Sequence, residues 1–347
     1  MIKYLYILIL VYFNLSYTQN NVATTSAAFL EIGAGARSLS MGGAFVSVAD
    51  DASTLYWNPA GMVNLNNPHL QTYYIPWLVD TEYYYGTSVV PLGALGSLGF
   101  SYTAVTMDEM IVRTVEDPEP DEYGQKFDAG NIALGIAYAK RLTDRFSFGF
   151  QSKFVQEKIW QMQAKGYAID IGTLFITENN IRIGMSISNF GGKLGMEGIN
   201  TLVDYDIDET IYGNNDRIDG YLDAAKWPLP LVFRFGVSKE YSINNQSKIL
   251  VSADAIHPNN NPEYINIGAE LNLIDLLFFR IGKSHFLYKQ RFIENDSDVF
   301  INHEQGISLG TGLKYQIPRG PKLTIDYVLM DFGIFKSLSG YSINLSF

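Results

Sequence analysis

Apolar and polar residues alternate along most of the chain after residue 68, the pattern of strands whose two faces meet different surroundings. In 145–160, for example, phenylalanines at even positions alternate with Ser147, Gly149, Gln151 and Lys153. Such runs, about ten residues long, are separated by turn residues. The pattern predicts about fourteen strands, at 69–78, 82–91, 95–106, 128–141, 145–160, 165–177, 181–189, 228–241, 246–256, 263–273, 276–286, 304–316, 322–331 and 337–347.

The last of these strands alternates strictly and ends on an aromatic residue. Together with an N-terminal secretion signal, it indicates the closing strand of an outer-membrane barrel. Its apolar positions are then the expected membrane-insertion signal: Tyr341, Ile343, Leu345 and Phe347. After the N-terminus no stretch reaches 18 consecutive apolar residues, so helical membrane spans are not expected. The predicted fold is all-β: a transmembrane antiparallel β-barrel of about 14 strands.

Composition agrees with a barrel and divides the chain into three parts. Aromatic residues make up 14% and charged residues only 18%, against about 25% in soluble domains. Residues 1–18 have the pattern of a signal peptide, with Lys3 ahead of a short apolar core. Residues 19–68 do not alternate and are expected to form a short N-terminal plug or hatch inside the lumen. Residues 69–347 are the predicted barrel.

The inner face of the predicted barrel is polar. The residues assigned to it are Lys153, Arg182, Asp254, Arg280, Asp326 and Gln151, with many Gly and Ser. Charged side chains can be hydrated or paired there, whereas on the lipid face each would cost about 2–4 kcal/mol near the midplane. Aromatic residues at strand ends, including Tyr73, Trp77 and Tyr83–Tyr85, are interpreted as interfacial girdles unless their rings face a pocket.

Connections between the predicted strands alternate between short turns and longer segments, with three long loops at 107–127, 190–227 and 287–303. If both the N- and C-termini are periplasmic, all three long loops are extracellular. The first two carry nearly all of the net charge of −11, so nucleic acid is not an expected partner. Acidic and apolar loop residues are candidates for docking a protein partner: Asp108, Glu109, Asp204, Asp206, Asp208 and Trp227.

Catalytic, metal and cofactor chemistry finds little support. The series Asp204-x-Asp206-x-Asp208 resembles the start of a calcium loop, but Glu209 stands where glycine is required and Asn215 where a bidentate Glu is required. Looser cation binding by the acidic loops stays open. The four histidines have no metal-ligand spacing, and there is no cysteine. We expect no enzyme activity, no metal site and no cofactor.

The N-terminal segment carries three ordered motifs, Gly35-Ala-Arg-Ser-Leu-Ser-Met-Gly-Gly-Ala44, Ala49-Asp-Asp-Ala52 and Trp57-Asn-Pro-Ala-Gly61. With these motifs the chain resembles the PorV/PorQ family of outer-membrane proteins, itself similar to the FadL-type fatty-acid transporters. The resemblance implies a fourteen-stranded barrel with the N-terminus folded inside it. It also implies a set of plug or hatch residues: Arg37, Met41, Gly42, Gly43, Asp50, Asp51, Asn58, Pro59 and Ala60.

These residue types also suit capping and turns, so a purely structural role is the favoured interpretation, with Asp50 as N-cap of a short helix 51–56.

The resemblance implies a non-enzymatic role in type IX secretion, in which PorV partners the translocon and carries secreted cargo. The expected location is the outer membrane of a Gram-negative, Bacteroidota-like bacterium, in contact with its lipids. The alternative is passive uptake of hydrophobic small molecules as in the FadL-type transporters. That alternative requires an apolar pocket in the lumen, able to hold a hydrophobic ligand or detergent, and the polar inner face counts against it. A purely structural barrel is the third option.

The closing-strand interpretation predicts that Phe347→Ser impairs membrane insertion, because it removes the terminal aromatic from the lipid-facing side of the last strand. The amount of folded barrel in the outer membrane should fall, measured as the band that shifts on heating in gel electrophoresis. Normal levels of folded Phe347→Ser protein would remove the closing-strand argument.

Overall fold

A computed structural model describes residues 24–206, 208, 210, 218–244, 246–287, 290–294, 297–301 and 305–347. The predicted signal peptide, 1–18, lies outside these residues. Fourteen long strands form one ring. Their bounds are β1 His69–Pro76, β2 Thr81–Pro91, β3 Ser97–Met107, β6 Ala129–Thr143, β7 Phe146–Ile159, β8 Met162–Ile176, β9 Ile181–Gly191, β13 Val232–Ser242, β14 Ser247–Pro258, β15 Tyr264–Leu273, β16 Leu277–Phe286, β19 Ile307–Gln316, β20 Lys322–Asp331 and β21 Ser337–Ser346.

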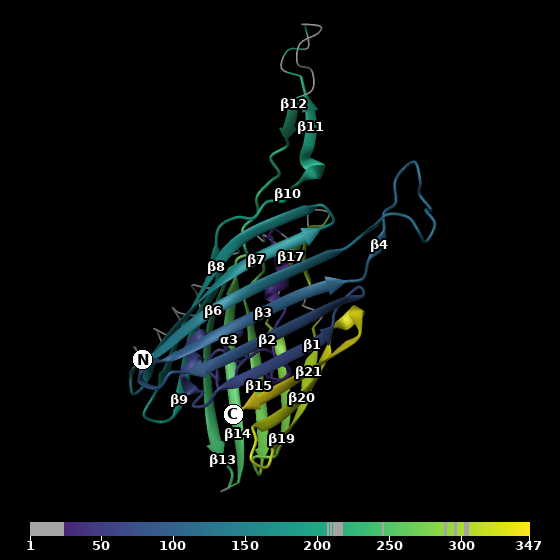
Figure 1. The fold of residues 1–347 in the computed structure, drawn as a ribbon. Helices are drawn as coiled ribbons and strands as arrows, with labels where there is room; N and C mark the ends of the chain where they lie inside the picture. The colour runs from purple at the N-terminus through teal and green to yellow at the C-terminus, as the bar shows by residue number, and fades with distance from the viewer. Residues whose placement is uncertain are drawn as a thin grey trace.

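The ring is a closed antiparallel barrel, so the predicted fold class is confirmed (Figure 1). Each strand pairs with its neighbour along the chain, and β1 closes the ring against β21, from Leu70 opposite Leu345 to Tyr74 opposite Tyr341. The two-residue β10, Glu197–Gly198, only extends the edge of β8. All fourteen predicted strands overlap observed ones, because a barrel wall with lipid on one side imposes the period-two pattern that the sequence shows.

Connections between strands divide between the two ends of the barrel. Every connection at the end that we call lower is a short turn, whereas the upper end, the top of Figure 1, carries the three long loops together with short turns such as that between β7 and β8. Two of the long loops contain hairpins, β4 Met110–Ile111 with β5 Lys126–Phe127 and β11 Leu202–Tyr205 with β12 Ile218–Tyr221. The third contains β17 Gln290–Glu294 with β18 Ser297–Ile301. Short 3-10 turns are η3 Gly93–Leu95, η4 Ile199–Thr201 and η5 Gly333–Phe335. The alternation along the chain predicted none of these hairpins.

The inner face of the barrel is polar on one side and aromatic on the other. The six residues predicted to face the lumen do so, and Gln151, Asp254, Arg280 and Asp326 are buried there. On β1 and β2, however, the inward residues are Tyr73, Ile75, Tyr83 and Tyr85, which pack with Val328 and Met330. The prediction of a uniformly polar lumen was therefore wrong. The girdle interpretation also fails for these tyrosines, because alternation along the chain does not tell which face looks inward.

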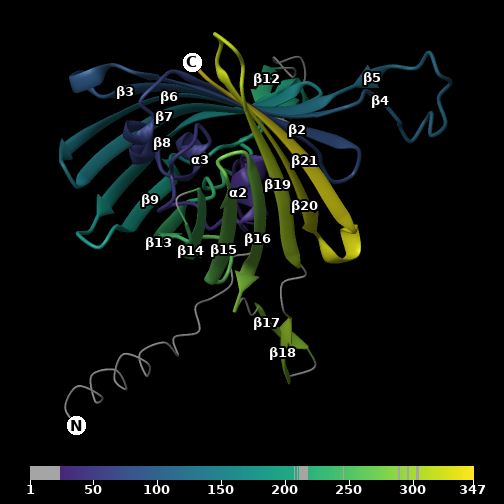
Figure 2. The ribbon, with the colours of Figure 1, turned by 90° about the horizontal axis from the view of Figure 1, so that it is seen from below.

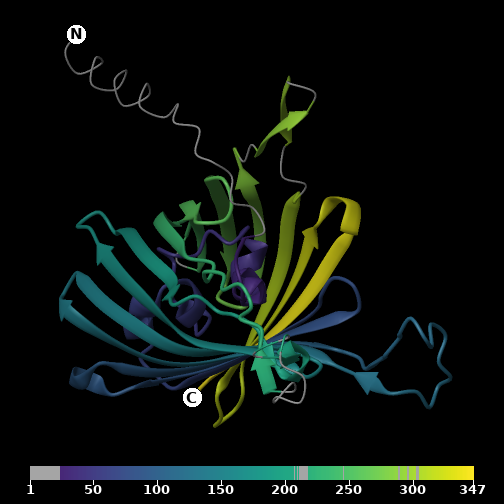
Figure 3. The ribbon, with the colours of Figure 1, turned by 90° about the horizontal axis from the view of Figure 1, so that it is seen from above.

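Residues 24–68, the N-terminal segment, run through the interior of the barrel. Viewed along the barrel axis, α2 (Ala36–Ser40) and α3 (Thr54–Trp57) lie inside the ring of strands (Figures 2 and 3). The segment also contains η1 (Ala28–Glu31) and η2 (Pro59–Asn64). Its backbone is bonded to the wall: Ala36 N donates to Ser342 Oγ (2.7 Å) and Val46 N donates to Asp254 Oδ2 (2.9 Å).

The prediction of a helix 51–56 capped by Asp50 was wrong. The helical turn begins later, at Thr54. Just before it, Asp51 Oδ1 accepts hydrogen bonds from Ser53 N (2.9 Å) and Ser53 Oγ (2.6 Å). Asp50 instead forms ion pairs. No helix among the described residues is long and apolar enough to cross a membrane.

Glycines on the wall allow the N-terminal segment to approach it closely. A Cβ added to Gly282 on β16 would lie 2.1 Å from Gly42 N and from Met41 C. Gly42 itself has φ +65, in the left-handed region where glycine is favoured. The turn Met41–Gly42 thus rests directly on the β16 backbone, and a larger residue at position 282 has no room.

Gly282→Ala should displace the N-terminal segment from the wall and expose Arg37 to trypsin in the folded barrel, because the added methyl group overlaps backbone atoms that cannot move aside. Gly86→Ala on β2 is the matched control, since a Cβ there meets nothing within 4 Å. Limited proteolysis with N-terminal sequencing measures the effect. Equal protection of Arg37 in the two variants would contradict the tight docking of this turn.

Candidate functional site

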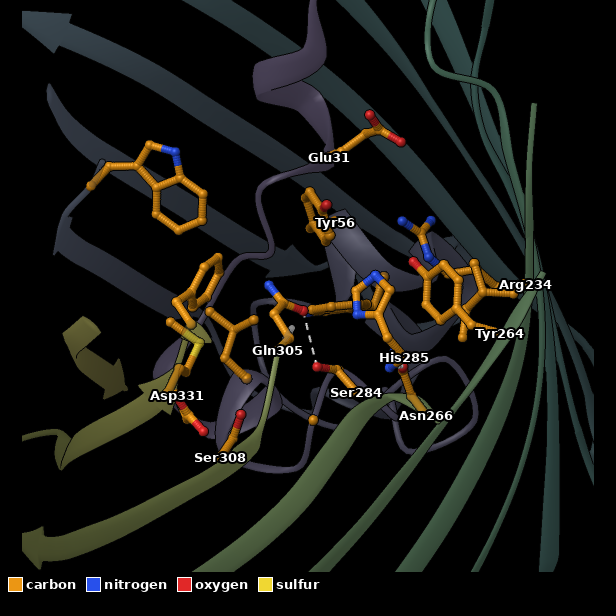
Figure 4. Close-up of a pocket in the computed structure, with 18 residues that line it drawn as sticks. Glu31, Tyr56, Arg234, Tyr264, Asn266, Ser284, His285, Gln305, Ser308 and Asp331 are labelled. Carbon is orange, nitrogen blue, oxygen red and sulfur yellow. Dashed lines mark hydrogen bonds between the residues drawn. The ribbon is translucent and has the colours of Figure 1, made fainter. Parts of the chain in front are cut away.

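The upper part of the lumen holds a cavity of about 110 Å³ that opens into solvent (Figure 4). Aromatic and aliphatic side chains form much of its wall: Leu39, Tyr56, Trp57, Trp77, Ile256, Tyr264, His285, Met330 and Phe332. A second space of about 430 Å³ shares part of this lining, including Trp77, Tyr264 and Phe332, and continues the cavity toward Phe29 and Ile32. Together they make one aromatic-lined recess of the size used for small molecules.

An irregularity in the barrel wall positions His285 in this cavity. The register of β15 and β16 shifts between the pair Ile265–Phe286 and the pair Ile267–Lys283, which leaves an extra residue on β16. His285 adopts φ 52 there, and its backbone N donates to Asn266 Oδ1 (3.0 Å). Its ring stacks on Tyr264, with 4.0 Å between the centroids. Bulges commonly redirect side chains in this way, and the result is a flat aromatic surface on the cavity wall.

Polar groups surround the mouth of the cavity. Ser284 Oγ donates to Gln305 Oε1 (3.0 Å), and Lys283 Nζ donates to the Gln305 carbonyl (2.6 Å). Opposite them, Trp77 and Phe332 pack edge to face, with 5.3 Å between their ring centroids. The mouth therefore combines an aromatic pair from the β1–β2 and β20–β21 turns with an amide side chain held from β16.

Three charged residues line the cavity from different elements, Arg234 from β13, Glu31 from η1 and Asp331 from the end of β20. Burial raises the pKa of Glu31 above its ordinary value, while a hydrogen bond from Asn260 Nδ2 (2.9 Å) and the positive charge of Arg234 act to lower it. The guanidinium of Arg234 lies 5.6 Å from the ring centroids of both Tyr56 and Trp57. Figure 4 shows Arg234, Tyr56 and Glu31 on the same side of the cavity.

The N-terminal segment separates this cavity from a second one at the lower end. Leu39, Gly42 and Gly43 line the upper cavity, whereas Arg37 lines a lower cavity of about 370 Å³. The lower cavity is lined mainly by charged and polar side chains, among them Asp51, Glu270, Lys314 and Asp326. Helix α2 and the turn after it are therefore both the floor of the aromatic cavity and the roof of the charged one.

A buried ion-pair network holds this floor in place. Arg37 is paired with Glu270 on β15 (Nε–Oε2 2.7 Å) and with Asp50 (Nη1–Oδ1 2.6 Å). Arg280 on β16 bridges Glu270 (2.6 Å) and Asp326 on β20 (2.6 Å). Burial alone would lower the pKa of Arg37, but the carboxylates of Asp50, Glu270 and Asp51 raise it well above its ordinary value. The guanidinium stays charged, so its contacts persist at any ordinary pH.

The residues expected in the hatch lie together inside the barrel. Asn58 is fully buried; its Nδ2 donates to the carbonyls of Val46 and Thr173 (2.9 Å each), and its Oδ1 accepts from Ala60 N (3.1 Å). Pro59 begins η2. Met41 is buried against Phe45 and Trp57. These contacts are those of structural residues, whereas Gly42 and Gly43 also line the upper cavity.

The loop residues expected to dock a partner lie outside the barrel lumen and apart from the cavity. Asp108 and Glu109 follow β3 and are exposed. Asp204 on β11 is exposed directly opposite Asp219 on β12. The side chains of Asp206 and Asp208 each accept a hydrogen bond from the backbone N–H two residues later. Trp227 is half exposed and forms an isolated β-bridge with Leu194. Tyr341, Ile343 and Phe347, of the expected insertion signal, are exposed on the outer surface, and Leu345 is partly buried.

Sequence reasoning missed most of the cavity. Tyr264, Arg234 and Gln305 were not singled out, His285 was counted only as a scattered histidine, and Trp77 was assigned to a girdle. Two aromatics flanking strand ends, Tyr264 and Trp77, were the available signal, but their inward orientation depends on register and on the bulge at His285. Among the described residues, no three His, Cys, Asp or Glu side chains are grouped so that they could hold a metal ion.

Comparison with known proteins shows the fold. No protein family known from sequence matches the chain, and no curated protein is similar to it in sequence. Among solved structures, the toluene transporter TodX of Pseudomonas putida matches with a TM-score of 0.50 at 12% identity, over 90% of this chain and 96% of that one. The toluene transporter TbuX of Ralstonia pickettii (TM-score 0.49, 12% identity, 90% and 97%) and a FadL homologue of Pseudomonas aeruginosa (0.48, 13%, 95% and 99%) are also similar. The chain thus shares its barrel fold with TodX.

Glu270→Gln should destabilise the barrel by about 3 kcal/mol, because it removes the charge shared by Arg37 and Arg280 in a buried network. Glu178→Gln is the matched control: Glu178 pairs with Arg145 at an exposed turn, where an ion pair contributes less than about 1 kcal/mol. Urea titration in lipid vesicles gives the free energies of unfolding. Equal losses for the two variants would show that the network does not stabilise the barrel.

Proposed function

We propose that this chain is an outer-membrane barrel that binds hydrophobic small molecules and passes them through its lumen. The observation that carries the proposal is the aromatic-lined cavity, which lies inside the barrel and opens toward its upper end. Apolar ligands gain roughly 25 cal/mol for each Å² removed from water, and rings gain more by stacking on Tyr264 and His285.

The arrangement suits binding followed by controlled release. A ligand entering from the upper end meets the Trp77–Phe332 pair and then the floor formed by Leu39, Gly42 and Gly43. Beyond this floor the lower cavity is charged, so an apolar ligand gains nothing by lying there. Release to the lower end requires the N-terminal segment to shift, which makes it the plug of the barrel. TodX, whose fold this chain shares, is described as a toluene transporter, which supports the same role here.

The proposed location is the outer membrane of a Gram-negative, Bacteroidota-like bacterium, with the upper end outward and both termini periplasmic. Exposed apolar residues on the outer surface of the strands, such as Phe150, Ile171 and Phe279, suit contact with lipid. The lower end carries the short turns, as the periplasmic ends of such barrels do.

Protein docking in type IX secretion is the second candidate function. It is favoured by the hairpin of β11 and β12, which has one apolar face formed by Val203, Tyr205 and Ile218. The opposite face carries Asp204 and Asp219 side by side. A lone two-stranded hairpin is only marginally stable in water, so a basic partner, the translocon or secreted cargo, would stabilise it. The cavity has no part in such docking, and for this reason uptake is the leading proposal.

Expression of the chain in a Gram-negative host lacking its own hydrocarbon channels should raise the uptake of radiolabelled ethylbenzene several-fold. Gln305→Trp should reduce this uptake, because the larger side chain narrows the mouth of the cavity. Gln316→Trp, at the exposed lower end of β19, is the matched control and should transport normally. Correctly inserted barrel with uptake no higher than in the empty host would overturn the proposed function.

A further inference from the structure

Arg234 is a buried cation for which the described residues provide no carboxylate partner. Only 6% of its surface is exposed, and none of the described acidic side chains brings an oxygen within 4.0 Å of its guanidinium. Its one hydrogen bond among these residues runs from Nη1 to Ser188 Oγ (2.9 Å). A guanidinium has five N–H donors, and burying them without partners is costly. This arginine therefore has donors available for a ligand.

The other buried arginines of the lumen show that the barrel can pair such groups. Arg37 contacts three carboxylates, and Arg280 bridges Glu270 and Asp326. Glu31 lines the same cavity as Arg234, but its Oε2 accepts a hydrogen bond from Asn260 Nδ2 instead. Of these three arginines, only Arg234 lacks a carboxylate partner among the described residues, and it is the one that lines the aromatic cavity.

The rings around Arg234 leave the donors of the guanidinium free. Tyr56 and Trp57 each lie with their centroid 5.6 Å from its central carbon, as in cation–π contacts. Such contacts use the face of the ring, which is a weaker acceptor for an N–H group than a carboxylate oxygen. The planar fork that remains matches the two oxygens of a carboxylate.

The rest of the wall specifies the body of the ligand. Tyr264 and His285 present a stacked pair, and Trp77 and Phe332 present an edge-to-face pair, in the same continuous space. Rings prefer offset-stacked or edge-to-face partners over aliphatic chains of equal area. We infer that the upper cavity selects an aromatic carboxylate, with its ring among these side chains and its carboxylate bound to Arg234. This inference rests on the proposed function and narrows its substrate class.

The test uses the purified full-length barrel in lipid nanodiscs and isothermal titration with three probes, 4-phenylbutyrate, 4-phenyl-1-butanol and octanoate. The wild-type protein should bind 4-phenylbutyrate about tenfold more tightly than the alcohol, which has the ring without the charge. It should also prefer it to octanoate, which has the charge without the ring. Arg234→Gln should abolish the preference for acid over alcohol and leave the affinity for the alcohol within about twofold.

Arg182→Gln is the matched control, because Arg182 does not line the upper cavity and pairs with Asp50, which lines the lower one. It should keep the preference for the acid. If Arg234→Gln does not fold, Arg234→Lys retains a charge without the fork and should weaken 4-phenylbutyrate several-fold.

Equal binding of acid and alcohol by the wild-type protein, or a preference that survives loss of Arg234, would overturn the inference while leaving hydrophobic uptake intact. Tighter binding of octanoate would replace the aromatic acid by an aliphatic one and overturn it as stated. Failure of all three probes to bind, together with ethylbenzene uptake at the level of the empty host, would remove both the inference and the proposed function.

Discussion

The ion-pair network of Arg37, Glu270, Arg280 and Asp326 is the constraint on which the interior of this barrel depends. A wall of fourteen strands encloses more space than its own side chains fill, and the N-terminal segment occupies part of the remainder. Because charges taken out of water are costly unless paired, the network specifies one position for Arg37 and so for helix α2. That position divides the lumen into an aromatic cavity above and a charged cavity below.

The division gives each part of the N-terminal segment two roles. Leu39 and Gly43 face the aromatic cavity while Arg37, two residues earlier on α2, faces the charged one. The contacts that stabilise the fold and the surface offered to a ligand therefore belong to the same short helix and turn. In the proposed function a ligand passes only if the network rearranges, so that stability and transport would be linked through Arg37 and its partners.

The barrel itself could be predicted from the sequence because its cause is local. Lipid outside and a filled lumen inside impose a period of two on every strand, as in Phe148 and Phe150 against Ser147 and Gln151. The candidate site could not be predicted in the same way. Arg37 and Glu270 are 233 residues apart, and the orientation of His285 depends on a bulge that no pattern marks. Similarly, Tyr73 and Tyr83 alternate as membrane-girdle tyrosines would, yet they face inward.

The central claim is that the upper cavity holds an apolar small molecule. The most direct measurement is purification of the tagged protein from its native outer membrane in mild detergent, followed by mass spectrometry of everything that accompanies it. We expect a barrel without protein partners that carries a small aromatic or other apolar molecule. Recovery of a very large translocon barrel or of secreted proteins, with no small molecule bound, would contradict it and favour the docking role.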